Sequence, residues 1–331
     1  MEFVQRDVVS REDLERELQA IEALAPWQIE GVFGPTSLTW RIYREGAIFL
    51  GAGRALLLQL AHPYVAAAIA EHSRTLADPI GRFHRTFNIT FTLVFGTLDQ
   101  AFRAARRLHQ RHSAIQGVLP QAVGPFGAGA HYRANDVAAL RWVYAALIES
   151  ALIAHDLVLA AVSARERELY YAESRRFAAL FGVPASALPA DWTGFAAYCE
   201  ATRQPHELAV SDAARAIAAE IFAGTGLWVR APRWYKALTA QMLPPHLREA
   251  FELRDRDVER RIAAQAITLA RSIYPALPER VGHVGPYQET TARLAGRARP
   301  DLATQLVNRL WIGQGSMTRS HEPSELKRRP S

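Results

Sequence analysis

Helix-starting signals recur along this chain, and no segment alternates apolar and polar residues as a half-buried β-strand does. Ser10 stands before two acidic residues, and Thr97 has Gln100 three residues later, which is the spacing of a capping box. Asp78-Pro79 joins a capping side chain to a proline suited to the first helical position. Alanine, leucine and arginine, all good helix formers, are frequent between these signals. The sequence therefore predicts an all-α fold.

The helices are placed by these caps and by the glycines and prolines that end them. The first runs from Ser10 to about Leu24, and a long buried helix is predicted from Thr39 to His62, before Pro63. The glycine- and proline-rich stretch 118–133 is predicted to be a loop. The other predicted helices span about 64–73, 79–96, 97–117, 135–158, 163–182, 249–273 and 288–311, and three more begin at 191, 211 and 232.

Composition excludes several classes of protein. Cys199 is the single cysteine, so a disulfide framework, a Cys₄ zinc site or a thiolate-bound cluster cannot form within the chain. All but two of the 39 basic residues are arginine, and they are spread along the chain, which argues against a nucleic-acid-binding protein. No apolar run reaches the ~18–20 residues of a membrane-spanning helix, and the N-terminus has no export signal. We therefore expect no transmembrane segment and a cytoplasmic location.

Sequence motifs for common enzymes are missing, which leaves histidine as the main chemistry-bearing residue. There is no P-loop, GxGxxG, HExxH or GxSxG motif, and no glutamate has a histidine three residues later. His109 and His112 continue the apolar positions Leu98, Phe102 and Ala105 at helical steps, so both are predicted on a buried face. A buried neutral imidazole can bind a metal or haem iron, or it can be a core residue bonded to a carbonyl.

Polar side chains at the start of the apolar helix 79–96 form a second candidate site. Arg82 and Thr86 are four residues apart and share a face, and Arg85 lies beside them. These arginines can be solvated, can pair with Asp78, or can form the polar rim of an apolar pocket that meets a carboxylate such as a haem propionate. Trp142, on the helix from 135, is typical of a core residue or of a cofactor wall.

An ordered set of motifs resembles the rubber-oxygenase catalytic domain family, which includes the latex-clearing proteins and the fungal MpaB oxygenase. The likeness extends to about residue 250. Its motifs are 53–63, Glu71-His72-Ser73, Asp78-Pro79 with Arg82 and Arg85-Thr86, His112 with Ile115 and Gly117, Trp142-Val143, Tyr170-Tyr171 with Glu173, 180–184, Trp192 with Tyr198, and Leu243-Pro244-Pro245 with Arg248.

The resemblance implies an all-helical, globin-like core that holds haem b. His112 matches the proximal iron ligand, and His109, one turn earlier, is the rival. Arg82 and Thr86 match an arginine and a threonine on the distal side. Arg85 stands where latex-clearing protein has a lysine that can bind iron. Because arginine has no lone pair to give, that lysine-ligated form is not expected here.

Arg54 and Trp142 complete the expected cofactor contacts. Arg54 interrupts an apolar helix, and a buried guanidinium is costly without an anion. The candidate anions are a haem propionate, which the family motif around Arg54 favours, and the carboxylates of Glu71, Asp78 or Glu149. A guanidinium that reaches water is the remaining possibility.

The expected function is that of a haem b-dependent oxygenase, an oxidoreductase that uses O₂ on a small hydrophobic alkene, prenyl-like alkenes included. The alternative is a haem-binding sensor or carrier without turnover. The expected organisation is one helical domain. An N-terminal helix and loop cover 1–35, the oxygenase-like catalytic domain covers 36–255, C-terminal helices pack on it over 256–315, and a disordered tail covers 316–331.

Overall fold

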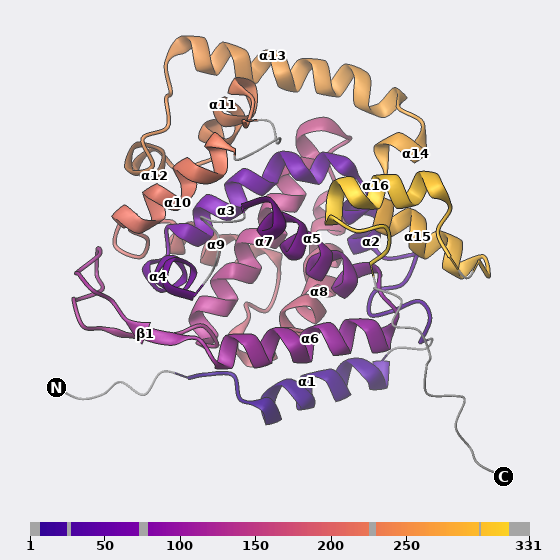
Figure 1. Cartoon of the computed structure of the whole chain (residues 1–331), viewed down its shortest axis with the longest axis horizontal. Coiled ribbons are helices and arrows are strands. Elements are labelled where there is room, and N and C mark those ends of the chain that lie inside the picture. Colours follow the sequence, from indigo (N-terminus) through magenta and orange to yellow (C-terminus); the bar gives the residue numbers. More distant parts are fainter. Residues whose placement is uncertain (1–6, 25–27, 73–78, 225–229, 298, 318–331) are drawn as a thin grey trace.

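Helix α7 (Val137–Val158) lies in the middle of the fold, with α3 (Ala52–Leu60) and the 3-10 helix η1 (Gly46–Gly51) packed along it (Figure 1). The structure is a computed structural model that describes residues 7–24, 28–72, 79–224, 230–297 and 299–317, the side chains of Pro79, Ile80 and Arg82 excepted. Helices dominate these ranges, so the predicted all-α class is confirmed. The globin-like arrangement of the core stays a prediction.

The remaining elements surround these three. A two-stranded sheet, β1 (Gln116–Val118) with β2 (His131–Arg133), is the only sheet in the described ranges. The other helices are α1 (Arg11–Leu24), α2 (Leu38–Tyr43), α4 (Pro63–His72), α5 (Pro79–Phe95), α6 (Leu98–Ser113), α8 (Ala164–Ala179), η2 (Ala185–Ala187), α9 (Trp192–Thr202), α10 (Asp212–Ala223), α11 (Arg233–Gln241), α12 (Pro245–Ala250), α13 (Asp257–Ile273), η3 (Tyr274–Ala276), α14 (Glu279–Gly282), α15 (Gly285–Leu294) and α16 (Leu302–Ile312).

Most predicted helix starts are confirmed, because each depends on side chains only a few residues away. Thr97 and Gln100 form the capping box, with Gln100 N 3.2 Å from Thr97 Oγ1 and Thr97 N 2.9 Å from Gln100 Oε1. Asp136, rather than Asn135, caps α7. Asp78 lies outside the described residues, so its predicted capping role stays a prediction.

The long helix predicted from Thr39 to His62 is wrong. The segment forms α2, η1 and α3 in succession. Glu45 leaves the helical conformation with ψ 125° and forms an isolated antiparallel bridge with His283. Gly51 lies so close to α7 that a Cβ there would overlap the carbonyl oxygen of Ser150. The chain is therefore reshaped by contacts with partners far away in the sequence.

The loop predicted over 118–133 is also partly wrong. Its ends pair as an antiparallel hairpin in which Gln116 is opposite Arg133 and Gly117 is opposite Tyr132. Each strand has three residues, too few to show the alternation of a longer strand. Helix α6 consequently ends at Ser113, before Gly117.

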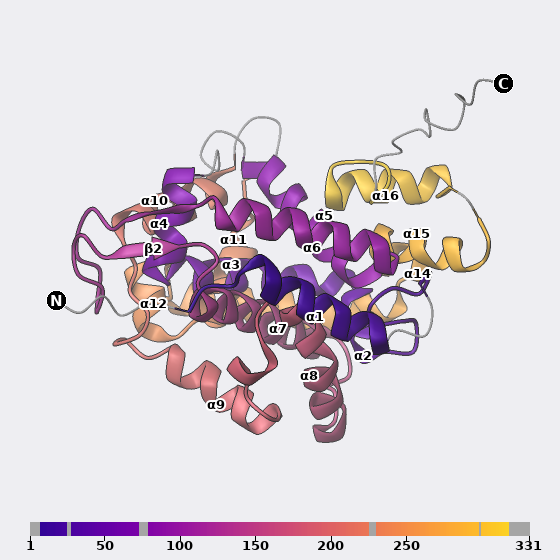
Figure 2. The same cartoon turned by 90° about the horizontal axis from the view of Figure 1, so that it is seen from below.

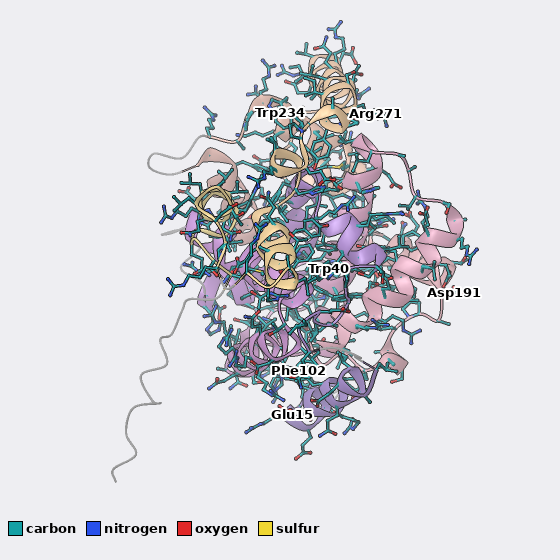
Figure 3. The ribbon with its side chains drawn as sticks, turned by 90° about the vertical axis from the view of Figure 1, so that its right-hand side faces the viewer. Glu15, Trp40, Phe102, Asp191, Trp234 and Arg271 are labelled. Atoms are coloured by element: carbon teal, nitrogen blue, oxygen red, sulfur yellow. The ribbon has the colours of Figure 1, made fainter. Side chains whose placement is uncertain are left out.

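Aromatic and aliphatic side chains fill the centre of the molecule. Trp40 lies in this core between the two ends marked by Glu15 and Phe102 and by Trp234 and Arg271 (Figure 3). Its Nε1 donates to Val94 O at 3.0 Å, and its ring meets Phe95 edge to face. Burial of each such side chain contributes about 1.5–3 kcal/mol.

Helix α7 is the one described helix that is long and apolar enough to cross a membrane by length and composition. Of its most apolar window, 61% is buried inside the fold. The window also includes the ion-paired carboxylate of Glu149. Most of this window therefore packs within the fold.

Candidate active site

Helices α5 and α6 pack against each other (Figure 2), and a cavity of about 990 Å³ lies beside them, bounded also by α4, α7 and the β1–β2 hairpin. It brings Arg85 and Thr86 of α5 together with His112 of α6. Its described lining residues all fall within one stretch of the chain, from Gln59 to Val143. The others are Tyr64, Val65, Ala68, Ile69, His72, Ile89, Leu108, Arg111, Ala114, Ile115, Arg133, Ala134, Ala139 and Leu140.

His112 is the imidazole of this cavity. Its side chain is half-buried and forms no hydrogen bond with the described residues. Although part of the ring faces the cavity, the surrounding protein removes it from bulk water. This burial, with the positive charges of His109 and Arg111, lowers the pKa of His112 to about 4. The ring is therefore neutral at pH 7 and keeps a nitrogen lone pair available to a ligand.

His109 faces a different hollow. This second hollow, of about 620 Å³, lies between α1 and α6 and contains neither Arg85 nor Thr86. His109 Nε2 lies 3.2 Å from Ser113 Oγ. The buried face of α6 ends at Ala105, so the prediction that both histidines are buried on it is wrong. Beyond that residue α6 borders two cavities, which leaves each imidazole half-buried.

Arg54 has a protein carboxylate as its partner. Its Nη2 lies 2.6 Å from Glu149 Oε2, its Nη1 donates to Ser150 Oγ at 2.7 Å, and its Nε donates to Met242 O at 3.0 Å. Arg203 Nη1 approaches the same Glu149 oxygen at 2.5 Å. Burial acts to raise the pKa of Glu149, but these two guanidinium groups outweigh it and lower that pKa.

The anion that balances Arg54 is therefore Glu149, one of the alternatives, and not the favoured haem propionate. Arg54 does not line the cavity. Of the other candidate anions, Glu71 accepts a hydrogen bond from Tyr132 Oη at 2.6 Å, and Asp78 lies outside the described residues. Arg54 makes no contact with the cavity in this arrangement. Its Nη2, Nη1 and Nε groups bond to Glu149, Ser150 and Met242 inside the core instead.

Trp142 is likewise a core residue. It is 1% exposed, its Nε1 donates to Leu58 O at 2.9 Å, and its ring meets Tyr198 edge to face. Its neighbours Leu140 and Val143 line the cavity, but Trp142 does not. On α7, the wall of the cavity is therefore formed by residues other than Trp142.

Arg82 lies on the backbone of α5, one turn before Thr86, and its side chain is outside the described part of the structure. Its two predicted roles, catalytic and cofactor-binding, stay predictions. Arg85 and Thr86 have exposed side chains that line the cavity. The two residues that the sequence placed next to each other therefore reach the same space as His112.

Several cavity residues were missed in the sequence. Gln59 and His72 were noted only as parts of motifs, and His72 Nε2 lies 3.2 Å from Gln116 O. Arg111 could have been recognised in the sequence, because it directly precedes His112, the predicted iron ligand. Arg133 had no signal, because its place depends on the unpredicted hairpin.

The chain matches one protein family model, described as "ER-bound oxygenase mpaB/B'/Rubber oxygenase, catalytic domain", over residues 40–272. The match covers well over half of the chain. It begins in α2 and ends in α13, so it includes every described residue that lines the cavity. No curated protein and no solved structure matches the chain.

Proposed function

The chain belongs to the mpaB/rubber oxygenase catalytic-domain family, and from this premise we propose that it is a haem b-dependent oxygenase acting with O₂ on a hydrophobic alkene. The family is one of oxygenases, so the chain is an oxidoreductase of that kind. The haem and the alkene are the finer parts of the proposal. Prenyl-like alkenes are included in this substrate class.

The observation that carries the proposal is the environment of His112. A neutral imidazole without a hydrogen-bond partner among the described residues lines a cavity of about 990 Å³. That volume is at the upper end of the usual range for ligand pockets, about 300–1,000 Å³. Haem iron needs one proximal protein ligand. The described residues contain no group of three or more His, Cys, Asp or Glu side chains that could hold a metal by themselves.

The residues around His112 suit this cofactor. His112 would hold the iron through its free nitrogen. When bound, haem supplies an iron centre at which O₂ is activated. Much of the wall is apolar, with Val65 and Ile69 from α4, Ile89 from α5, and Val143 from α7. These side chains exclude water and hold a substrate that has no polar group of its own.

Arg85 and Thr86 are the proposed catalytic residues, with Arg82 beside them on α5. The Thr86 hydroxyl and the Arg85 guanidinium both donate hydrogen bonds, and both line the cavity. Hydrogen-bond donors placed where negative charge develops stabilise that charge in the transition state. An arginine guanidinium donates hydrogen bonds and has no lone pair to give, so Arg85 offers donors to the reacting groups and no ligand to a metal.

The absorption spectrum of the purified protein tests the cofactor. A Soret band is expected, and His112→Ala should remove most bound haem or shift that band, while His109→Ala should leave it nearly unchanged. His109→Ala is the matched control, because it removes from the same helix an imidazole that faces the other hollow. If His109→Ala loses the band and His112→Ala keeps it, the assigned ligand is wrong.

Turnover is tested by O₂ consumption and product formation with a prenyl-like alkene. An oxygenase consumes O₂ in step with the alkene, and Thr86→Val should slow that reaction while haem remains bound. A protein that binds haem and shows no reaction with any alkene would instead be the sensor or carrier that is the alternative.

A further inference from the structure

The charged side chains that line the cavity in the described structure are all basic. Three arginines line it, Arg85 from α5, Arg111 from α6 and Arg133 from β2, and none of its described lining residues is Asp or Glu. Two of these arginines, Arg111 and Arg133, form no ion pair and no side-chain hydrogen bond with the described residues. The proposed catalytic roles do not use them. Among the described lining residues, no carboxylate balances their positive charges.

Two of the three other arginines of α6 form ion pairs with the described residues. Arg103 Nη2 lies 2.6 Å from Asp99 Oδ2, and Arg106 Nη2 lies 2.7 Å from Glu15 Oε2 on α1. Neither lines the cavity. The negative end of the α6 dipole stabilises the charge of Arg111 but provides no carboxylate. Arg107, which lines the hollow beside α1, forms no ion pair with the described residues either, so Arg111 differs from it in the space that it faces.

Arg111 and Arg133 lie in neighbouring parts of the structure. Arg111 is in the last turn of α6, one residue before His112. Arg133 is at the end of β2, opposite Gln116 in the hairpin. The next residue, Ala134, donates its N–H to Ile115 O at 3.0 Å, which fixes the end of β2 against the chain that leaves α6. Both guanidinium groups therefore come from the side of the cavity that provides His112.

Resting on the proposed haem binding, we propose that Arg111 and Arg133 bind the two haem carboxylates and so set which way the cofactor enters the cavity. A guanidinium binds a carboxylate through two parallel hydrogen bonds. These bonds neutralise the charge of the carboxylate and also fix its orientation. The apolar wall then receives the ring system, while the acidic edge meets the two cations. Arg111 and Arg133 are accordingly positioning residues for the cofactor.

The test compares two forms of the cofactor, ferric haem and its dimethyl ester, in which both carboxylates are blocked. Each is titrated into the full chain purified without haem, and binding is followed by the Soret absorbance. Ferric haem should bind the unaltered chain more tightly than the ester. Arg111→Gln and Arg133→Gln should each weaken the binding of ferric haem about fivefold, since exposed ion pairs are worth less than buried ones. Neither should change the binding of the ester.

Arg107→Gln is the matched control. Arg107 lies one turn before Arg111, is also exposed and without an ion pair to the described residues, but lines the hollow beside α1. Its replacement should change the binding of neither form. Arg111→Lys and Arg133→Lys keep the charge and should recover part of the preference for the acid. Circular dichroism of each variant checks that the helices are retained.

Equal binding of ferric haem and its ester to the unaltered chain would overturn this inference and leave haem binding intact. So would a double variant, Arg111→Gln with Arg133→Gln, that weakens both forms equally. If the preference for the acid survives in the double variant, another cation receives the carboxylates and the assignment to this pair is wrong. If neither form gives a Soret change, the proposed haem binding fails and this inference fails with it.

Discussion

Arg54 and Glu149 form a buried ion pair that joins α3 to the middle of α7, with Nη2 and Oε2 2.6 Å apart. The Arg54 side chain is 4% exposed and that of Glu149 is 13% exposed. A buried pair contributes modest net stability, but the loss of one partner leaves the other in a poorly solvating environment. The pair therefore makes α3 and α7 sensitive to changes at either residue.

Arg54→Leu should destabilise the protein in the absence of any cofactor. Glu149 keeps Arg203 as a partner, but Ser150 and the Met242 carbonyl each lose a hydrogen bond. We expect a loss of about 3 kcal/mol in the free energy of unfolding, measured by urea denaturation. Arg16→Leu, at the exposed pair with Asp13, is the control and should cost less than about 0.5 kcal/mol. Unchanged stability in Arg54→Leu would show that the pair is dispensable.

Stability at mildly acid pH should depend on His112. The folded state lowers its pKa from 6.5 to about 4, so the folded chain binds the proton more weakly than the unfolded chain does. The contribution of His112 is therefore complete above pH 6.5 and is lost as the pH falls towards 4. A shift of this size corresponds to about 3 kcal/mol, and screening by water around the half-buried side chain should reduce the loss to about 2 kcal/mol in the cofactor-free protein.

Urea denaturation at several pH values between 7 and 4 measures this slope. His112→Asn should flatten it, and His109→Asn should flatten it less, because the pKa of His109 is lowered by a smaller burial together with Arg11. A slope that His112→Asn leaves unchanged would mean that His112 titrates normally in the folded chain.

The sixth coordination position of ferric haem should not be filled by Arg85. With an arginine there, the resting protein is expected to have water or an open position, and imidazole or cyanide should bind readily. Arg85→Lys introduces a side chain with a lone pair when it is deprotonated and should produce a low-spin spectrum at alkaline pH.

A low-spin nitrogen-ligated spectrum in the unaltered, ligand-free protein would contradict this expectation. Three histidines that precede His112 in the chain, His62, His72 and His84, are the candidates for such a ligand. Of these only His72 lines the cavity, whereas His84 Nε2 lies 3.1 Å from Leu310 O on α16. His72→Ala would then be the variant that removes the nitrogen ligand.

The close packing of η1 against α7 should depend on the absence of a side chain at position 51. Gly51→Ala would drive a methyl group into the Ser150 carbonyl and should cost about 1–3 kcal/mol in thermal or urea unfolding. Gly127→Ala is the control, because nothing lies within 4 Å of a Cβ added there. Equal stability of the two variants would show that α7 can move away from η1 at little cost.

Local signals in the sequence were sufficient for helix starts, but not for contacts between distant segments. Thr97 and Gln100 cap each other across three residues, so the start of α6 could be predicted. The break in the helix predicted from Thr39 depends on Ser150, about one hundred residues later, and on His283. The residues next to Gly51 in the sequence do not indicate either of these distant contacts.

The candidate site also combines residues that could be predicted from local sequence with residues whose place depends on distant contacts. The helical repeat placed His109 and His112 on one helix, and the family likeness favoured His112, but only the packing of α1 and α5 shows that they face separate hollows. From the sequence, Arg54 was expected to pair with an anion, but several candidates remained. The structure identifies the partner as Glu149 of α7. Arg133 joins the cavity through a hairpin whose strands are too short to be recognised.

The described walls of the cavity come from one continuous stretch, Gln59 to Val143, and this order has a consequence for biosynthesis. A ribosome adds residues from the N-terminus at roughly 5–20 per second, and segments can fold as they emerge. All of the described residues that line the cavity are synthesised before the first residue of α8. The later helices are therefore added to a chamber whose described lining has already been synthesised. The outer partners of the Arg54–Glu149 pair, Met242 for Arg54 and Arg203 for Glu149, are also synthesised after that lining.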